Sequence, residues 1–320
     1  MRFNVVVGNP PYNNDRYIDF VMAGHKLSSG YSLWITPAKW QNKLDRGKED
    51  DVNGKFRDAI TSYMSHVVYY PETRDIFDIL NRGGISYYLC SKDKVNTCKV
   101  VNISKDCSYF NSSEERVLSG NICLLNFVNR LLDRIDLSDN LSKHIDTDNC
   151  PYIFRMRNGR DKKLNEDDLE ILSSHGKSYG FIDRNRVHKN IETLDEFKCI
   201  MTTKSGGAEI YKSRNKAING RILGLNTLYK YSPGQICTGD YFKVYSGSES
   251  EVDSFISYMS CKLINLLYFA HCCNSNINNL CFDLVPMPDA FDHIFTDKEL
   301  YAKYNLTDDE IAVIESVIRE

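Results

Sequence analysis

The sequence lacks the features that mark membrane, secreted and disulfide-rich proteins. No apolar run approaches the roughly 18 residues that a membrane-spanning helix needs. The N-terminus has none of the basic, apolar and small-residue parts of a signal peptide. The 11 cysteines are an odd number and include no CxxC pair, which favours reduced thiols over a disulfide framework. We therefore expect a cytoplasmic protein.

Regular metal-ligand spacing is also missing. The tightest group of candidate ligands comprises Cys261, His271, Cys272, Cys273 and Cys281, whereas structural zinc sites are typically built from two close pairs. Cysteine is among the residues most often buried, so we expect core thiols here and predict no metal site. The sequence also contains no internal repeat and no low-complexity segment.

The net charge of −3 hides a strong asymmetry along the chain. Residues 1–150 hold 19 basic and 19 acidic side chains, residues 151–245 hold 17 and 11, and residues 246–320 hold 4 and 13. A basic middle segment favours a polyanionic partner. The alternative is an ordinary solvated surface of mixed charge.

The pattern of the first third predicts an α/β domain. Short apolar runs typical of buried strands alternate with amphipathic stretches of helical spacing. The predicted strands cover residues 3–7, 31–35, 66–70, 84–90 and 98–103, and the predicted helices cover residues 17–27 and 52–64. Strands that alternate with helices indicate a parallel or mixed sheet covered on both faces.

The remaining chain divides by composition. We predict an α/β domain over residues 1–120, a helical connector over 121–149 and a mixed α+β domain over 150–290, followed by a helical tail over 291–320. The connector carries an amphipathic helix at 121–137, and the third domain carries a strong apolar helix at 252–271. In the tail, Thr307 and Glu310 have the spacing of a capping box.

The stretch with the most chemistry is Asn9-Pro10-Pro11-Tyr12, which follows a Val-rich strand. Two prolines fix φ and remove two N–H donors, so the turn presents carbonyl oxygens rigidly. The Asn9 side chain and the Pro10 carbonyl then offer two acceptors to an amino group. Tyr12 offers a flat face for stacking. The alternative is a simple strand-terminating turn, for which these residues are ordinary.

This motif resembles that of the amino-group methyltransferases, which use S-adenosylmethionine (SAM) to methylate an exocyclic or amide nitrogen. Other segments are similar to adenine-specific DNA methyltransferases of restriction-modification systems. These segments are residues 33–40 (LWITPAKW), 83–88 (GGISYY), 238–241 (TGDY), 258–262 (YMSCK), 282–289 (FDLVPMPD) and 295–311. The resemblance implies a partial Rossmann-like methyltransferase sheet followed by a mixed α+β target-recognition domain, in a bacterial or phage-infected cell.

The resemblance also implies roles for individual residues. Asn9, Pro10, Pro11 and Tyr12 would hold an adenine that has been flipped out of double-stranded DNA. Candidate base-pocket residues follow the second strand, namely Trp34, Pro37 and Trp40. The alternative is that Trp34 belongs to the core and that Trp40 packs on a helix. Candidate DNA contacts are Lys39, Arg82, Arg155, Arg157, Arg160, Arg184, Arg186, Lys204 and Arg214.

The sequence departs from the family at the cofactor. The family's SAM site uses a glycine-rich loop after a strand, and no stretch of this sequence fits that pattern. Without the strand that normally flanks it, the NPPY strand would expose an apolar edge. We therefore expect a partner chain that carries the SAM-binding half, or self-association that covers this edge.

Two other functions compete with a DNA adenine methyltransferase subunit. One is an inactive DNA-binding module, acting as a specificity subunit or decoy. The other is methylation of release-factor glutamines or of ribosomal RNA, which the long basic extension after the motif disfavours. The sequence has no PD-(D/E)xK arrangement that would indicate a linked nuclease.

Overall fold

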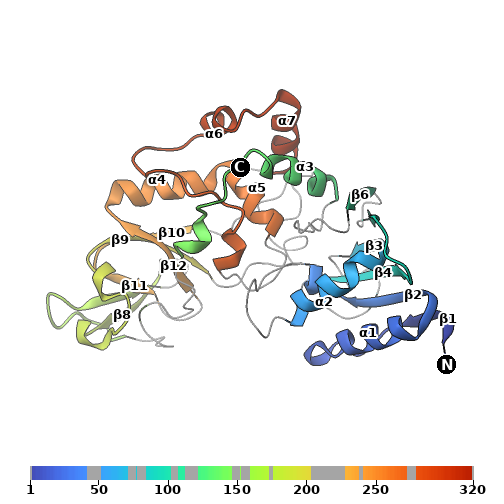
Figure 1. Ribbon diagram of the computed structural model, residues 1–320. Helices are drawn as coiled ribbons and strands as arrows, with labels where there is room; N and C mark the ends of the chain where they lie inside the picture. Colours follow the sequence, from blue (N-terminus) through green and yellow to red (C-terminus); the bar gives the residue numbers. More distant parts are fainter. Residues whose placement is uncertain are drawn as a thin grey trace. The chain divides into compact units, whose positions relative to one another are not determined.

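A computed structural model describes residues 2–41, 52–70, 77, 84–101, 107–111, 122–145, 152, 159–172, 176–202, 228–237, 241–271 and 279–318. These residues form a mixed α/β structure with mixed sheets (Figure 1). The chain divides into two compact units. The first runs up to Arg134, and the second begins at Ile135 and holds most of the remaining described residues. The break falls after the predicted boundary at residue 120, because α3 (Ile122–Leu132) contacts β6 (Cys107–Asn111) of the first unit.

The first unit contains a six-stranded sheet in the order β1-β2-β4-β3-β5-β6. The strands are β1 (Phe3–Gly8), β2 (Ser28–Pro37), β3 (Met64–Tyr70), β4 (Ile85–Ser91), β5 (Thr97–Val101) and β6. Pairing is parallel between β1 and β2 and between β3 and β5, whereas β4 is antiparallel to both of its neighbours. The strands β1, β2, β3 and β5 therefore end at the same edge of the sheet. The sequence did not predict β6.

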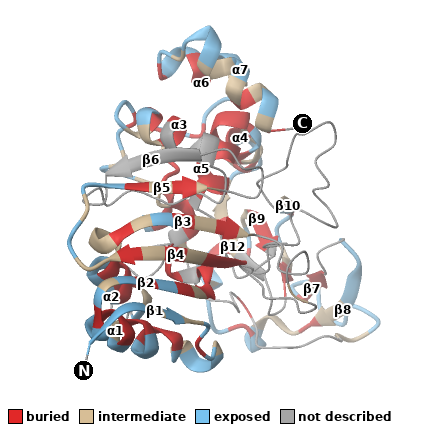
Figure 2. Cartoon of the chain, turned by 90° about the vertical axis from the view of Figure 1, so that its right-hand side faces the viewer, coloured by how far each residue is buried: buried red, intermediate tan, exposed pale blue. Residues whose placement is uncertain are grey.

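Helices cover one face of this sheet. The helices α1 (Tyr17–Leu27) and α2 (Val52–Ile60) contribute Tyr17, Val21 and Phe56 to a core that also contains Met64 and Tyr88 from the strands. Alternate residues of β2, β3 and β4 are buried, and several of them belong to this core (Figure 2).

The sheet was predicted to be covered on both faces, and this is wrong for the face opposite the helices beside β1. Val5 and Val7 of β1 are 55% and 68% exposed, and Tyr31 and Leu33 of β2 are also exposed. The register places Val5 beside Tyr31 and Val7 beside Leu33. Within the described part of the chain, no helix covers these four side chains. The result is an open apolar face next to the β1 edge.

The second unit contains two three-stranded sheets, ordered β10-β9-β12 and β11-β7-β8. Their strands are β7 (Leu169–Leu172), β8 (Ser178–Ile182), β9 (Phe197–Thr202), β10 (Leu228–Tyr231), β11 (Gln235–Cys237) and β12 (Tyr241–Gly247). Four helices follow, namely α4 (Glu249–Ser260), α5 (Lys262–His271), α6 (Asp297–Lys303) and α7 (Asp308–Val317). A core around Leu169, Ile200 and Ile236 joins the two sheets.

Two helix predictions for this unit had different outcomes. The predicted helix at 252–271 is wrong as one element, because Cys261 is extended (φ −60°, ψ 138°) and separates α4 from α5. The Asp297 carboxylate accepts the Lys262 backbone N–H at 2.6 Å, which satisfies a donor at the start of α5. The capping box predicted for Thr307 and Glu310 is confirmed at the start of α7.

Within these ranges, no helix is long and apolar enough to cross a membrane. The same residues contain no group of three or more His, Cys, Asp or Glu side chains that could hold a metal ion. The described cysteine side chains are buried free thiols at Cys90, Cys98, Cys199, Cys237, Cys261 and Cys281.

Candidate functional site

The Asn9–Tyr12 turn leaves the sheet at the carboxyl end of β1. Open α/β sheets bind ligands at the carboxyl ends of their strands. Asn9 and Pro11 are exposed, Pro10 is buried, and Tyr12 is half-buried. The exposed Asn9 amide is therefore available to a ligand, whereas Pro10 anchors the turn. Burial raises the pKa of the Tyr12 hydroxyl, which keeps it protonated at neutral pH.

Packing, rather than side-chain hydrogen bonding, holds this turn. No described residue forms a side-chain hydrogen bond with residues 9–12. Gly8, the last residue of β1, lies opposite Trp34 in the register of β1 and β2. A Cβ atom on Gly8 would lie 2.4 Å from Cζ3 of Trp34, so only glycine leaves room for the indole.

The segment after the turn is tied to α2. Asn14 and Asp15 both have positive φ, of 52° and 59°, in the left-handed region that Asn and Asp tolerate better than most residues. The Tyr17 hydroxyl donates to the Asn53 side-chain oxygen at 2.6 Å, and Asn53 Nδ2 donates to Asp15 at 3.4 Å. Burial and then the Asp15 charge raise the pKa of Tyr17.

The predicted base-pocket residues lie in the interior instead. Trp34 is 4% exposed and Trp40 is fully buried, and Pro37 is also buried. Trp40 packs edge-on against Phe56 of α2 and against Tyr88 of β4, and its indole N–H donates to the Thr36 hydroxyl at 3.1 Å. This burial corrects the expectation that the three side chains form the wall of an open pocket. It favours the alternative that Trp34 belongs to the core and that Trp40 packs on a helix.

The described residues do not fit a SAM site. Among the described residues, β1 is the edge of its sheet, and neither a strand nor a glycine-rich loop from these residues flanks it on the outer side. In the second unit, Gly247 joins β12 to α4, but Ser248 and Glu251 already cap that helix. Its first turn also carries Glu249 and Glu251, whose charges oppose an anionic ligand at a helix N-terminus.

Most predicted DNA contacts lie outside the described residues. These are Arg82, Arg155, Arg157, Lys204 and Arg214, together with the side chain of Lys39. The net positive charge of residues 151–245 also lies mostly outside the described residues. Of the 17 basic residues between 151 and 245, seven fall outside the described ranges, accompanied by only two of the 11 acidic residues. The predicted polyanion-binding charge is therefore concentrated in parts of the chain that the structure does not describe.

Of the arginines predicted to contact DNA, the structure describes three, and two of these are engaged with carboxylates. Arg160 forms an ion pair with Asp168 at 2.7 Å, and the Asp168 side chain is fully buried. Arg184 donates from both terminal nitrogens to Asp195, at 2.8 and 2.5 Å. These contacts favour a structural role for both arginines. Arg186 is exposed, and no ion pair joins it to a described acidic residue.

Sequence reasoning missed a buried lysine that organises the same unit. Lys198 is fully buried, and its ammonium group donates to the carbonyl oxygens of Thr193, Leu194 and Glu196 at 3.1, 3.2 and 2.7 Å. Burial lowers the pKa of Lys198 to about 8. No local signal separates this lysine from the solvated lysines around it.

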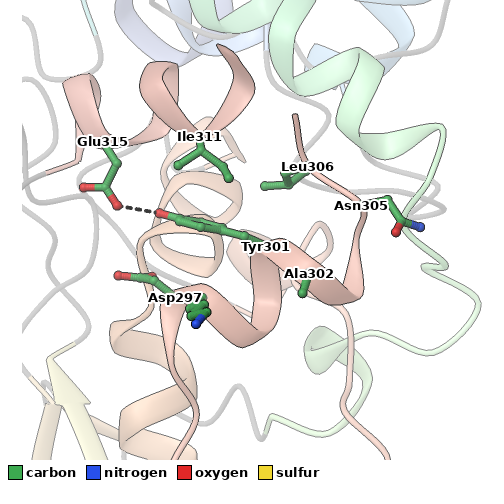
Figure 3. Close-up of a pocket in the computed structure, with 8 residues that line it drawn as sticks. Asp297, Tyr301, Ala302, Asn305, Leu306, Ile311 and Glu315 are labelled. Carbon is green, nitrogen blue, oxygen red and sulfur yellow. Dashed lines mark hydrogen bonds between the residues drawn. The ribbon is translucent and has the colours of Figure 1, made fainter. Parts of the chain in front are cut away.

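Described residues of the second unit line two clefts. One, of about 590 Å³, lies between α6 and α7, where the Tyr301 hydroxyl donates to Glu315 at 2.9 Å (Figure 3). The other, of about 620 Å³, is lined by residues that include Asp136, His144 and Asp289. Neither cleft is lined by a residue predicted to act in catalysis or DNA binding.

Comparison with models of protein families and with curated protein sequences gives no match to this chain.

Proposed function

We propose that this chain is the catalytic and target-recognition part of a SAM-dependent DNA adenine-N6 methyltransferase. One observation carries the proposal. An Asn-Pro-Pro-Tyr turn lies at the carboxyl end of a parallel strand, with Asn9 exposed and Pro10 buried. A turn of this kind presents oxygen acceptors to a ligand while its own backbone stays fixed.

The adenine amino group is a poor nucleophile because the ring withdraws its lone pair. The Asn9 side-chain oxygen and the Pro10 carbonyl oxygen accept one amino hydrogen each, which pulls the nitrogen toward tetrahedral geometry. The Tyr12 ring stacks on the purine face. Such a contact requires the base to leave the duplex, so the substrate is flipped-out adenine. Holding the amine in line for attack supplies much of the rate without a covalent enzyme intermediate.

The methyl donor belongs to a different polypeptide segment in this proposal. The described residues contain no SAM-binding loop, and the β1 edge next to the catalytic turn is open. We infer that a second chain adds a strand to β1 and completes a Rossmann-like sheet. The exposed Val5, Val7, Tyr31 and Leu33 would then be covered. Pairing between two copies of this chain is the competing arrangement.

Double-stranded DNA would bind through the second unit and through the basic segments between residues 151 and 245. Support for this assignment comes from the charge of those residues and from the sequence resemblance. Phosphate contacts from Arg and Lys would set the position of the unit on the duplex, and contacts to base edges would select the sequence.

The test is Asn9→Ala, expressed together with its genomic neighbours so that a SAM-binding partner is present. Because Asn9 is exposed, its truncation should leave the unfolding free energy within about 0.5 kcal/mol of the parent. Transfer of tritium from labelled SAM to unmethylated DNA should fall at least about 100-fold, while DNA affinity stays the same. Asn4→Ala, at an exposed position of the strand that leads into the turn, is the matched control and should retain transfer.

Two results would separate the alternatives. If the parent complex transfers no methyl group yet binds DNA with sequence preference, the chain is an inactive specificity module or decoy. If Asn9→Ala retains full transfer, the NPPY turn is a structural turn and the proposed chemistry is wrong.

A further inference from the structure

The indole of Trp34 occupies the space beside the residue that precedes the catalytic turn. A Cβ atom on Gly8 would lie 2.4 Å from Cζ3 of Trp34 and 2.9 Å from Cε3. Real Cβ atoms do not approach other carbons so closely. The indole therefore fills the space that a side chain at position 8 would need, immediately before Asn9.

A second glycine lies close to another part of the same indole. A Cβ atom on Gly24 of α1 would lie 2.4 Å from Cη2 of Trp34 and 2.5 Å from Cζ2. The indole is thus enclosed between β1 and α1 and is only 4% exposed. Its buried Nε1 has no hydrogen-bond partner among the residues described. Packing alone holds the ring. A substitution that changes the shape of this packed site must therefore displace a neighbouring group.

Apart from the burial of Pro10, the catalytic turn has few other restraints. Pro10 and Pro11 have no N–H to donate, and no described side chain is hydrogen-bonded to residues 9–12. The position of the Asn9 and Pro10 oxygens must then follow from where β1 ends. An error of about 1 Å in the placement of reacting groups can cost about 100-fold in rate.

We propose that Trp34 is a positioning residue for the proposed methyl transfer, which sets the Asn9–Tyr12 turn through its packing against Gly8. This assignment rests on the proposed function, and it replaces the predicted role of Trp34 as a wall of the base pocket. Trp34 itself does not touch the base.

The test introduces a steric clash at Gly8 in one variant and relieves that clash in a second variant. Gly8→Ala introduces a methyl group where the indole lies, and Trp34→Phe removes part of the indole. Gly24→Ala is the matched control, because it strains the same indole from the helix side, away from the motif. Each variant is prepared as the full chain with its genomic neighbours. The measurements are urea unfolding, hydrogen exchange of a peptide covering residues 9–16, and methyl transfer from labelled SAM.

We expect Gly8→Ala to speed exchange in this peptide and to reduce transfer about 100-fold, beyond any loss in Gly24→Ala. The double variant Gly8→Ala with Trp34→Phe should regain at least about a tenth of the parent's transfer and most of its protection from exchange. Equal losses in Gly8→Ala and Gly24→Ala, or no recovery in the double variant, would overturn the positioning role. If the parent transfers no methyl group, the proposed function fails. The exchange data then still decide whether Trp34 positions the turn.

Discussion

Arg160 and Asp168 form an ion pair in which the carboxylate is fully buried and the guanidinium is partly exposed, with Nη2 and Oδ2 2.7 Å apart. The same carboxylate oxygen accepts the backbone N–H groups of Leu164 and Asn165, at 2.7 and 3.0 Å. Asp168 therefore closes the loop that follows Arg160. A buried carboxylate that accepts two backbone N–H groups and pairs with a guanidinium is a structural centre, and Arg160 is one of its supports.

We expect Asp168→Asn to lower the free energy of unfolding by about 1–3 kcal/mol, because a neutral amide loses the ion pair with Arg160 and accepts the two backbone N–H groups less strongly. Urea denaturation followed by circular dichroism measures this change. Asp161→Asn, at an exposed position of the same loop, is the control and should stay within about 0.5 kcal/mol. Equal stability of the two variants would show that Asp168 does not organise the loop.

Arg184 and Arg186 lie two residues apart and should differ in their effect on DNA. Arg184 is already engaged with Asp195, whereas Arg186 is exposed without an ion pair to a described acidic residue. Under the proposed function, Arg186→Ala should weaken DNA binding and reduce the salt dependence of the affinity by about one unit of slope. Arg184→Ala should change that slope much less. Fluorescence anisotropy at several salt concentrations tests both, and the reverse order would reject this assignment.

Local patterns predicted the elements that depend on local physics. The apolar spacing predicted α1 with its observed ends, Tyr17 and Leu27, because one face of that helix is buried. The box of Thr307 and Glu310 formed because its hydrogen bonds join residues only three apart. Among the described strands, β1 lies at the edge of its sheet.

Other features of the fold depend on contacts between residues that are far apart in the sequence, and local patterns do not predict them. Cys261 ends a helix that looks continuous, and Asp297, 35 residues from Lys262, caps the next one. Trp34 lies in β2, beside the last residue of β1. Gly24 of α1 and Gly8 of β1 together enclose it, and neither glycine signals this alone. The ammonium group of Lys198 donates to three backbone carbonyl groups. The spacing of residues in the sequence does not predict that these three groups lie together.

His25 should make the first unit less stable in mild acid. It is 7% exposed, its ring lies 4.8 Å from that of Tyr63, and Nδ1 is 3.2 Å from the Ser32 hydroxyl. Burial and then the Lys92 charge lower the pKa of His25 below 6.5. The unfolded chain then binds the proton more readily than the folded chain. The free energy of unfolding should therefore fall as pH drops below 6.5.

Tryptophan fluorescence can follow this effect, because both tryptophans lie in the first unit. His25→Gln should flatten the decline in stability between neutral pH and pH 5. His293→Gln is a control, because the contribution of His293 to stability should depend on pH in the opposite direction. Hydrogen bonds with Asp292 and Glu299 raise the pKa of His293, so its stabilisation is present in acid and is lost as pH rises. An unchanged acid slope in His25→Gln would assign the decline to other groups.

The β1 edge should be the surface on which another polypeptide pairs. Val5 and Val7 are 55% and 68% exposed, and β1 has no neighbour on its outer side among the described strands. Replacing both with lysine should change the unfolding free energy of the isolated chain little, since neither side chain is buried. Charged side chains on an edge strand oppose further pairing, however. The double variant should therefore lose association, measured by sedimentation with and without the co-expressed neighbours.

Phe20→Lys, at a 54% exposed position of α1, is the matched control and should keep this association. If the lysine pair leaves assembly intact while Phe20→Lys disrupts it, the partner binds the helical face and the β1 edge is not the site of sheet completion.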